Sequence, residues 1–560
     1  MATGGQVLIE ALRLAGVRHI WGLPGTQTLA VWDALLQQDV IKAYFLRNEA
    51  DLSLAAKGYF QAGGGISAVV TVPGPGATNM LTGVIDALTD SAGMVLITTD
   101  VPKEHIGKGC VHESDLKSVF ASAVKAQEIV DRPDQLADAV FKSVYGAGGG
   151  RPGPIQVIVS GQLLRADAGT ALPTETDAAR HRPTVRRAVS DADLNEAARQ
   201  LTGAKRPLIY AGGGVAFAHA EAALQQLAER LGAAVVTSLA GRGVIPDDHK
   251  LSVGVPFFPS VNDLIGQSDA ALVVGTRFSE FSTASWAFKL PATTIRVDVD
   301  ESALELNYAP SFAVLGDARE FLEGLVARIP ERRHAANGWS ATIAETRAAQ
   351  EKATDAMAAE APLVKRIHPT QAIQALRAAL PKDVAVTMDG SATEMWVMDP
   401  SFPVYTARGF ICSEVFQELG AALPLAIGAK VAQPDRPVVC ISGDGGMMYC
   451  VGELSAMVSQ GIDVKIVVFD DGGWYNSIRQ FQDAFFDGRV IGTFLGNPDF
   501  KQLSAAFGVS YRCAKKTDEV EPLVRQMLSE KGPGMLVVEI DKEPIAPRFK
   551  VRITERRKTL

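Results

Sequence analysis

Two short apolar runs, separated by an amphipathic stretch, constrain the fold more than any other feature of the 560-residue chain. The first run, residues 438–442, is followed by Gly-Asp-Gly-Gly (443–446). The second run, residues 464–469, is followed by Asp-Asp-Gly-Gly (470–473). Between them, residues 453–458 carry apolar side chains at helical spacing. A strand, a helix and a second strand predict neighbouring parallel strands, so both acidic loops should lie at the same edge of one sheet.

The two acidic loops offer oxygen ligands. Asp444 and Asp471 each follow a predicted strand, and open α/β sheets bind ligands at the carboxyl ends of their strands. Mg²⁺ prefers a few carboxylates together with phosphate oxygens, and glycine lets the backbone approach a ligand closely. The loops therefore predict a site for a divalent cation and a diphosphate, and the alternative is a βαβ unit with ordinary acidic turns.

Helix and strand patterns alternate over most of the chain. They predict an α/β fold with three doubly wound parallel-sheet domains, at residues 1–164, 191–330 and 364–547. Residues 165–190 are polar and aperiodic, residues 331–363 are rich in Ala and charge, and both are predicted to be linkers. The predicted strands are residues 19–22, 41–46, 68–72, 94–98 and 155–159 in the first domain, 206–211, 233–237, 270–274 and 294–299 in the second, and 384–388, 438–442 and 464–469 in the third.

Gly-Gly-Gly at 212–214 follows the strand 206–211. A dinucleotide loop is one interpretation, but the spacing is not Gly-x-Gly-x-x-Gly. We therefore predict a tight strand-to-helix turn here.

Two strand-end loops in the first predicted domain carry further signals. Glu49, in the sequence Arg-Asn-Glu, follows one strand and precedes a helix. A catalytic carboxylate is one interpretation, and a Glu that favours a helix N-terminus through the helix dipole is the alternative. The next strand ends in Pro-Gly-Pro-Gly-Ala-Thr-Asn (73–79), a backbone that can approach a ligand closely.

Composition excludes several classes of protein. The formal net charge is −8, and no basic cluster indicates a nucleic-acid partner. No apolar run reaches the ~18 residues that a membrane span needs, and we expect no signal or transit segment before the first amphipathic helix. The five cysteines form no Cys-x-x-Cys pair. We expect a cytoplasmic protein that acts on small molecules.

These motifs together resemble a known family. Trp-Gly-Leu-Pro-Gly (21–25), Arg-Asn-Glu (47–49), Gly-Pro-Gly-Ala-Thr-Asn (74–79), the two acidic loops and Asn-Pro-Asp-Phe (497–500) look like the acetolactate synthase-like branch of the thiamine-diphosphate-dependent enzymes. The resemblance implies pyrimidine-binding, central and diphosphate-binding domains in this order. It also implies thiamine diphosphate and Mg²⁺ as cofactors, and a homodimer or homotetramer, because the Glu and the diphosphate motif of this family come from different subunits.

The resemblance assigns roles residue by residue. Glu49 would hydrogen-bond N1′ of the cofactor's aminopyrimidine, and Leu419 would hold the cofactor in its V shape, although a leucine beside Gly420 is otherwise ordinary core. Mg²⁺ would be bound by Asp444, Asp471 and the carbonyl of Gly473. The other residues that the resemblance places against the cofactor are Gly25, Pro73, Asn79, Gly390, Ser391, Gly443, Gly445 and Gly446.

Four departures from the family pattern bear on function. Asp471 stands where Asn is usual, which adds a negative charge beside the diphosphate. Ser279-Glu280 replaces the Asp-Asp of synthases that bind FAD, so FAD stays an open alternative. Phe481 replaces a Trp that contacts the second substrate in the family. His112 lies where the family has Gln, and it would be either a proton donor or a surface-loop residue.

The activity implied by the resemblance starts from a 2-oxo acid. Loss of CO₂ gives an enamine on the cofactor, which adds to a second 2-oxo acid or aldehyde in acetolactate synthase-like carboligation. A 2-oxo acid decarboxylase or C–C lyase of the same family is the alternative, because protonation of the enamine gives an aldehyde. A non-catalytic paralogue that keeps the fold is a third hypothesis, which Glu49 and the two diphosphate loops disfavour.

Overall fold

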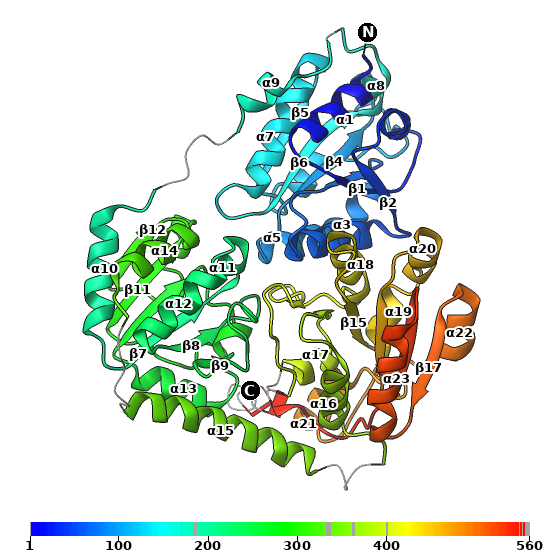
Figure 1. The fold of residues 1–560 in the computed structure, drawn as a ribbon. Helices are drawn as coiled ribbons and strands as arrows, with labels where there is room; N and C mark the ends of the chain where they lie inside the picture. The colour runs from blue at the N-terminus through cyan, green and yellow to red at the C-terminus, as the bar shows by residue number, and fades with distance from the viewer. Residues whose placement is uncertain are drawn as a thin grey trace. The chain divides into compact units, whose positions relative to one another are not determined.

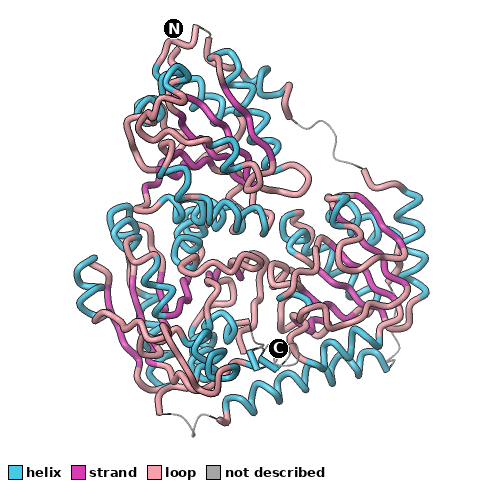
Figure 2. The backbone as a smooth tube through the Cα atoms, turned by 180° about the vertical axis from the view of Figure 1, so that it is seen from behind, coloured by secondary structure: helices cyan, strands magenta, loops and turns pink. Residues whose placement is uncertain are grey.

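The computed structural model describes residues 2–169, 171–182, 188–331, 338–360, 365–398, 401–547, 549–550 and 553–554. The strands form three six-stranded sheets in which every pair of named strands is parallel, and helices flank each sheet (Figures 1 and 2). The predicted fold class is thus confirmed. The contacts divide the chain into two compact units, the first formed by Met1–Thr184, Phe416–Asp435 and Cys450–Val464, and the second by Val185–Val415, Arg436–Tyr449 and Lys465–Leu560.

The first sheet has the strand order β2-β1-β3-β4-β6-β5. Its strands are β1 (His19–Gly22), β2 (Lys42–Phe45), β3 (Ala68–Thr71), β4 (Met94–Asp100), β5 (Ala126–Val130) and β6 (Pro154–Ser160). Helices α1 (Gly4–Leu14) and α7 (Leu136–Gly148) lie on one side, and α3 (Glu49–Gln61) and α5 (Leu81–Thr89) on the other (Figure 1). Shorter helices complete this part of the unit: α2 (Leu29–Leu35), α4 (Pro75–Asn79), α6 (Leu116–Phe120), α8 (Gly161–Arg165) and α9 (Glu175–Ala179).

Two helices from late in the sequence belong to the first unit. Helix α18 (Ala422–Ala432) packs along α3, and α20 (Glu453–Gln460) lies near α18. Glycines allow the close approach of α18 and α3, because a Cβ added at Gly428 would lie 1.9 Å from the Ala55 carbonyl oxygen, and one at Gly58 would lie 2.2 Å from the Leu425 oxygen. The helix that carries Glu49 therefore packs backbone to backbone on α18.

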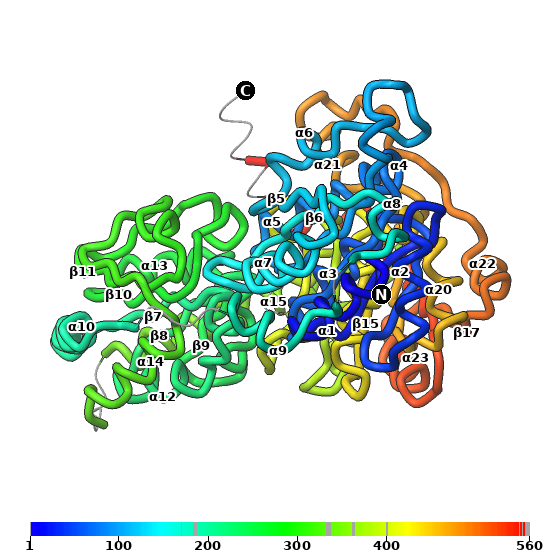
Figure 3. The backbone as a smooth tube through the Cα atoms, turned by 90° about the horizontal axis from the view of Figure 1, so that it is seen from above, coloured from blue at the N-terminus to red at the C-terminus, as the bar shows by residue number. Residues whose placement is uncertain are grey.

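The central sheet, in the second unit, has the order β12-β11-β10-β7-β8-β9. Helices α12 (Glu221–Leu231) and α14 (Ala318–Arg328) lie on one face, and α13 (Pro259–Gln267) on the other (Figure 3). Helices α10 (Asp191–Gly203) and α11 (Gly213–Phe217) complete this domain. Its strands are β7 (Pro207–Ala211), β8 (Ala234–Thr237), β9 (Ser252–Gly254), β10 (Ala270–Val274), β11 (Thr293–Asp298) and β12 (Phe312–Leu315).

The two predicted linkers are partly helical. The predicted linker at residues 331–363 contains the 21-residue helix α15 (Gly338–Ala358), which packs on α13 and buries Trp339, whose ring N–H donates to the Pro207 carbonyl. Within 165–190, α9 buries Ala178 against the first domain. Residues 170, 183–187, 332–337 and 361–364, which include the predicted start of the third domain, lie outside the described residues.

The third sheet has the order β14-β13-β15-β16-β18-β17, which repeats the order of the first sheet. Its strands are β13 (Ala385–Thr387), β14 (Phe410–Ile411), β15 (Val438–Gly443), β16 (Lys465–Asp470), β17 (Ser510–Ala514) and β18 (Gly534–Glu539). Its helices are α16 (Pro369–Ala379), α17 (Ala392–Val397), α19 (Asp444–Tyr449), α21 (Asn476–Phe485), α22 (Phe500–Phe507) and α23 (Thr517–Ser529). None of the helices in the described part of the chain has the length and apolar character that a bilayer crossing requires.

Each sheet has a pair of neighbouring inner strands from which the chain continues in opposite directions. This reversal point lies between β1 and β3 in the first sheet, between β7 and β10 in the central sheet, and between β13 and β15 in the third. In open α/β sheets, the crevice at the carboxyl ends of these two strands is the usual ligand site. Predicted cofactor residues follow these strands in the first and third sheets, whereas Glu49 follows the neighbouring strand β2 and Asp471 follows β16.

Candidate active site

At the reversal point of the first sheet, three loops meet. A Cβ added at Gly25, after β1, would lie 2.3 Å from Cγ1 of Val72, after β3. Gly74, which follows Val72 and Pro73, has a positive φ of 61°, and a Cβ there would lie 2.8 Å from the carbonyl oxygen of His112. Gly25 and Gly74 are required by this close approach, since a side chain at either position would force the loops apart.

Glu49 is the first residue of α3. Its Oε2 accepts a hydrogen bond of 3.1 Å from the side-chain amide of Asn79, and a Cβ at Gly76 would lie 3.3 Å from its Oε1. The N-cap is Asn48, whose side chain accepts from the N–H of Ala50. The Glu49 side chain is half-buried, so its carboxyl group is held by Asn79 and remains accessible for proton exchange.

His112 belongs to the same group of loops. Its φ of 70° is left-handed, and its Nδ1 lies 3.3 Å from Nε2 of Gln27, in the loop after β1. The first unit thus brings Gly25, Pro73, Asn79 and Glu49 into one region and places His112 beside it. Gln27 was not predicted as part of it.

The reversal point of the third sheet is formed by the loops after β13 and β15. A Cβ added at Gly446 would lie 2.1 Å from Oδ2 of Asp389, and one at Gly443 would lie 3.2 Å from Oγ1 of Thr393. The Oγ of Ser391 is buried and has no hydrogen-bond partner among the described residues. A narrow glycine-lined cradle with an unsatisfied hydroxyl group suits an oxygen-rich ligand such as a diphosphate.

Asp444 lies at the centre of an acidic cluster between β15 and β16. Its Oδ2 accepts from the N–H of Gly473 at 2.9 Å and from the side-chain amide of Asn497 at 2.7 Å. The same amide donates to Asp470 at 2.8 Å, and Oδ1 of Asp471 accepts from the N–H of Trp474 at 2.9 Å. Both predicted metal-binding carboxylates are therefore fixed by hydrogen bonds at the same edge of the sheet.

The cluster concentrates negative charge in a buried place. Burial, with a further contribution from the nearby Asp470 carboxylate, raises the pKa of Asp444 to about 6. Burial and the charges of Asp444 and Asp470 raise the pKa of Asp471 to about 8. A divalent cation would offset this repulsion, so the charge balance suits a bound metal ion.

The third predicted metal ligand, the carbonyl oxygen of Gly473, is already engaged in hydrogen bonds. The carbonyl oxygen of Gly473 accepts from the N–H groups of Leu495 and Gly496, at 2.9 and 3.2 Å. These two bonds use both lone pairs of the carbonyl, so a cation would have to displace one of them. No group of three or more His, Cys, Asp or Glu side chains is arranged to hold a metal among the residues that the structure describes. Of the three predicted metal ligands, the carboxyl groups of Asp444 and Asp471 thus stay the candidates that need no displaced backbone bond.

Leu419 and Phe481 lie on different units. Leu419 is half-buried in the loop before α18, in the first unit. Phe481, on α21 in the second, stacks on Phe485 with ring centroids 5.7 Å apart and contacts Phe549 at 4.7 Å. Phe481 therefore packs at the edge of the third domain's core, and its predicted contact with substrate stays a prediction.

The reversal point of the central sheet is tightly closed by backbone. A Cβ added at Gly212 would lie 2.1 Å from the Gly275 oxygen, and the Gly214 N–H donates to the same oxygen at 3.0 Å. Because β7 ends at Ala211 and α11 begins at Gly213, the predicted tight strand-to-helix turn is confirmed. Ser279, one of the departures from FAD-binding synthases, donates its hydroxyl to Glu414.

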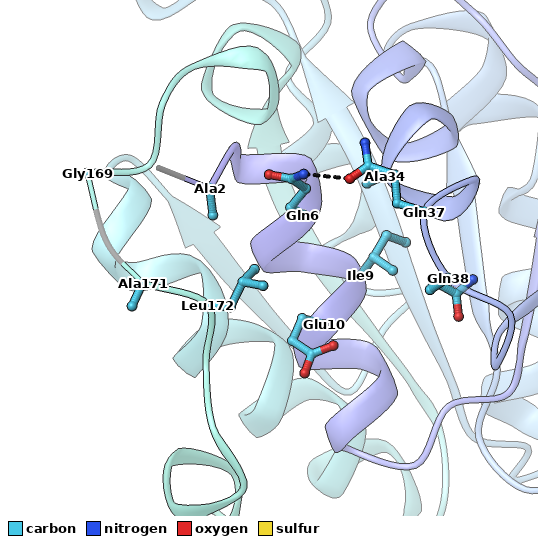
Figure 4. A pocket seen from close by; sticks show the side chains of 10 residues that line it. All are labelled: Ala2, Gln6, Ile9, Glu10, Ala34, Gln37, Gln38, Gly169, Ala171 and Leu172. Atoms are coloured by element: carbon cyan, nitrogen blue, oxygen red, sulfur yellow. Dashed lines mark hydrogen bonds between the residues drawn. The ribbon is translucent and has the colours of Figure 1, made fainter.

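A pocket on the first unit lies apart from these residues. It is bordered by α1, α2 and the segment after α8, and Gln6 donates to Gln37 across it at 2.7 Å (Figure 4). None of the predicted site residues lines it. Its lining residues are Ala2, Gln6, Ile9, Glu10, Ala34, Gln37, Gln38, Gly169, Ala171 and Leu172.

Comparison with known proteins identifies the family. The N-terminal TPP binding domain of thiamine pyrophosphate enzymes matches residues 2–119, the central domain matches 194–325, and the C-terminal TPP binding domain matches 389–540. The chain is 30% identical to a probable acetolactate synthase large subunit of Methanococcus aeolicus, over 96% of this chain and 92% of that protein. The chain belongs to the acetolactate synthase-like thiamine pyrophosphate enzymes.

Other relatives of this thiamine pyrophosphate enzyme are named for different activities. The chain is 29% identical to an acetolactate synthase of Arthrospira platensis, over 97% of this chain and 94% of that protein. It is 32% identical to a probable 2-ketoarginine decarboxylase of Pseudomonas aeruginosa, over 95% and 93%. The protein is thus a thiamine-diphosphate-dependent enzyme of a family that acts on 2-oxo acids, and the relatives leave the fate of the acyl group open.

The residues of this acetolactate synthase-like enzyme fit a magnesium diphosphate. The buried Ser391 hydroxyl and the cradle at Gly446 suit phosphate oxygens, and Asp444 and Asp471 suit Mg²⁺. Sequence reasoning missed Asn497, which joins Asp444 to Asp470, although its Asn-Pro-Asp-Phe motif was part of the resemblance. It also missed Glu453, because the chain pairs it with residues about 400 positions away.

Proposed function

We propose that the protein is a thiamine-diphosphate- and Mg²⁺-dependent enzyme that decarboxylates a 2-oxo acid and joins the remaining acyl carbon to a second carbonyl compound. The observation that carries the proposal is the placement of family residues after the carboxyl ends of parallel strands, Glu49 with Asn79 in the first sheet and Asp444 with Asp471 in the third. The near-full-length similarity to acetolactate synthases favours carboligation. The proposed substrates are 2-oxo acids and aldehydes.

Each residue would have a defined task. When bound, thiamine diphosphate supplies a nucleophilic carbon and takes up the electron pair that departing CO₂ leaves behind. Glu49 would exchange a proton with the aminopyrimidine ring, and Asn79 would orient the Glu49 carboxyl group. Asp444 and Asp471 would hold Mg²⁺, with Gly473 as the third ligand if its loop moves.

The remaining predicted residues would shape the cofactor and substrate sites. Gly390, Ser391, Gly443, Gly445 and Gly446 would surround the diphosphate. Gly25 and Pro73 would border the pyrimidine ring, Leu419 would support the bent cofactor, and Phe481 would lie toward the second substrate.

A 2-oxo acid decarboxylase is the second candidate function. The relative named as a probable 2-ketoarginine decarboxylase favours it. His112 also favours it. Its backbone lies beside Gly74 and its imidazole lies 3.3 Å from Gln27, and an imidazole in this group of loops could protonate the acyl carbon and release an aldehyde. A C–C lyase would use the same residues in the reverse direction.

The proposal also covers a further cofactor, the oligomeric state and the cellular location. FAD remains an alternative for the central domain, and the absorption spectrum of the purified protein would detect it. A homodimer or homotetramer is implied by the family, and a cytoplasmic location is expected from the sequence. Light scattering of the purified protein would measure the assembly.

Product analysis tests the proposed function. The protein is incubated with thiamine diphosphate, Mg²⁺ and pyruvate, alone and with a panel of aldehydes and 2-oxo acids, and products are identified by mass. Carboligation predicts a joined product, and free aldehyde as the sole product would favour the decarboxylase. The two departures from the family pattern at Phe481 and His112 suggest a second substrate that differs from that of an ordinary acetolactate synthase. Rapid formation of acetolactate from pyruvate alone would overturn this altered acceptor preference.

A further inference from the structure

Helix α20 forms hydrogen bonds with the end of strand β2 and with the loop that leads to Glu49. The side chain of Gln460 pairs with Phe45 twice, since its Oε1 accepts from the Phe45 N–H at 2.9 Å and its Nε2 donates to the Phe45 carbonyl at 2.7 Å. Ser455 accepts from Nε of Arg47 at 3.0 Å. Helix α20, which is distant in the sequence, therefore contacts residues 45–47 along one of its faces.

Glu453 makes the contact closest to Glu49. Its fully buried carboxylate accepts from the N–H of Arg47 at 2.8 and 3.1 Å and from the N–H of Asn48 at 3.1 Å. These are the two backbone groups that directly precede Glu49. Because backbone N–H groups bound to a carboxylate form strong hydrogen bonds, Glu453 fixes the backbone from which Glu49 projects.

A second carboxyl group touches Glu453 from the other side. Asp51, in the first turn of α3, is buried and in hydrogen-bond contact with the Glu453 carboxyl. Two carboxyl groups can hydrogen-bond only if one keeps its proton. Burial and the neighbouring Glu453 raise the pKa of Asp51 to about 9. Burial also raises the pKa of Glu453, but the hydrogen bonds from Asp51 and from the N–H groups of Arg47 and Asn48 oppose this rise.

The charged groups around the pair agree with this assignment. The Arg47 guanidinium favours the ionised form of Glu453, and the Glu418 carboxyl adds to the rise for Asp51. Glu418 is half-buried, and its pKa of about 8 reflects the loss of solvent around its carboxyl group first and then the nearby Asp86, opposed by Lys57. At neutral pH, Asp51 thus holds the proton and Glu453 holds the charge.

We propose that Glu453 and Asp51 are positioning residues, a hydrogen-bonded carboxyl pair that holds Arg47 and Asn48 and thereby sets the place of the Glu49 carboxyl group. The inference rests on the proposed role of Glu49. It gives Glu453 and Asp51 no contact with substrate or cofactor. Their effect on turnover passes through the loop.

Three variants separate this role from general stability. Glu453→Ala removes the acceptor of both N–H groups, and Asp51→Asn supplies a permanent N–H donor to Glu453. Ser455→Ala removes the Arg47 side-chain contact and the hydrogen bond from the Ser455 hydroxyl to the Gly452 carbonyl, and it leaves Glu453 in place. Glu453→Ala should lower kcat by about 10- to 100-fold with little change in KM, because a displaced catalytic group costs rate rather than substrate affinity. Ser455→Ala should stay close to wild type.

The pH profile of Asp51→Asn is the readout that a merely structural role would not change. In the wild type, kcat should fall as pH rises through about 9, where the pair loses its shared proton. In Asp51→Asn this fall should be absent, and kcat at neutral pH should be kept within about threefold. An unchanged alkaline fall in Asp51→Asn, or wild-type kcat in Glu453→Ala, would overturn the inference.

Hydrogen exchange gives a test that does not depend on activity. The amides of Arg47 and Asn48 should exchange at least about 10-fold faster in Glu453→Ala than in Ser455→Ala. Equal exchange rates in the two variants would overturn the proposed clamp, by which the Glu453–Asp51 pair holds the backbone of Arg47 and Asn48, even if no substrate is turned over. If the wild type decarboxylates no 2-oxo acid but the exchange difference is present, the proposed function fails and the clamp stands.

Discussion

The packing of α18 on α3 gives a prediction whose size can be worked from the structure. Gly428 faces the backbone of α3, and a Cβ there would lie 1.9 Å from the Ala55 oxygen and 2.6 Å from the Tyr59 nitrogen. Non-bonded carbon and oxygen atoms pack at about 3.5 Å, so Gly428→Ala must separate the helices by more than about 1 Å. Neither neighbour is a flexible side-chain end that could move aside.

The expected cost follows from overpacking. Adding a methyl group to a close-packed interface costs about 1–3 kcal/mol, and backbone neighbours place this variant at the upper end. The separation also loosens contacts around the fully buried Leu425 and Ala426. We expect the free energy of unfolding to fall by about 3 kcal/mol, and kcat to fall as well, because α3 carries Glu49 at its first residue.

Gly266→Ala is the matched control. Gly266 lies in α13, and a Cβ there would meet nothing within 4 Å. Gly266 is in the last turn of α13, where Ala meets no clash and is at least as favourable as Gly, so this variant should unfold at or slightly above the wild-type temperature. Thermal unfolding followed by circular dichroism compares the two. A midpoint for Gly428→Ala at or above that of the control would refute the backbone contact between α18 and α3.

Three further substitutions address the site. Glu49→Gln should fold and bind thiamine diphosphate but lose most turnover, because an amide cannot exchange the proton, and parallel measurements of kcat and cofactor affinity check this. Asp471→Asn should keep activity and tighten binding of the magnesium diphosphate, since the raised pKa of Asp471 means that its carboxyl group must lose a proton and become charged to bind Mg²⁺, which an amide need not do, and weaker binding in a titration would show that the second carboxylate is required. Lys57→Met removes the cation that Asp86 and Asp90 contact at 2.7 and 2.6 Å, and denaturant unfolding should show a loss of about 3–5 kcal/mol. An unchanged midpoint for Lys57→Met would remove that buried ion pair from the account of stability.

The strands that sequence reasoning found are mostly interior ones. Buried strands such as β10 and β15 are continuous apolar runs, which a sequence displays directly. The edge strands β5, β9, β12, β14 and β17 were missed because an edge strand is short or has an exposed face, as in the half-exposed sequence of Ala126–Val130. The interior strand β18 has a clear apolar run and could have been predicted.

Helix α15 shows why a composition can mislead. Its buried face consists of Trp339, Ile343, Thr346, Gln350 and Thr354, which recur at helical spacing. Only two of the five are apolar, and Gln350 instead donates to the Val253 carbonyl at 3.1 Å. A periodic apolar pattern was therefore absent, and the segment was taken for a linker.

The candidate site was predictable where a residue ends a strand. Glu49, Asp444 and Asp471 follow apolar runs, and the parallel topology then brings such loops to one edge of each sheet. The partners of these residues come from distant turns of the chain, as Asn497 does for Asp444 and Glu453 does for the Glu49 loop. No local pattern marks such pairs, since only the folded chain brings them together.

Binding of thiamine diphosphate tests the central claim most directly. Equilibrium dialysis of the purified protein against the cofactor, with Mg²⁺ and then with a chelator, measures affinity without any assumption about substrate. We predict saturable binding at a single site per chain that needs Mg²⁺ and is lost in an Asp444→Ala variant. Absence of saturable binding, or binding that is unchanged by the chelator and by Asp444→Ala, would contradict the assignment of the acidic loops to a magnesium diphosphate site.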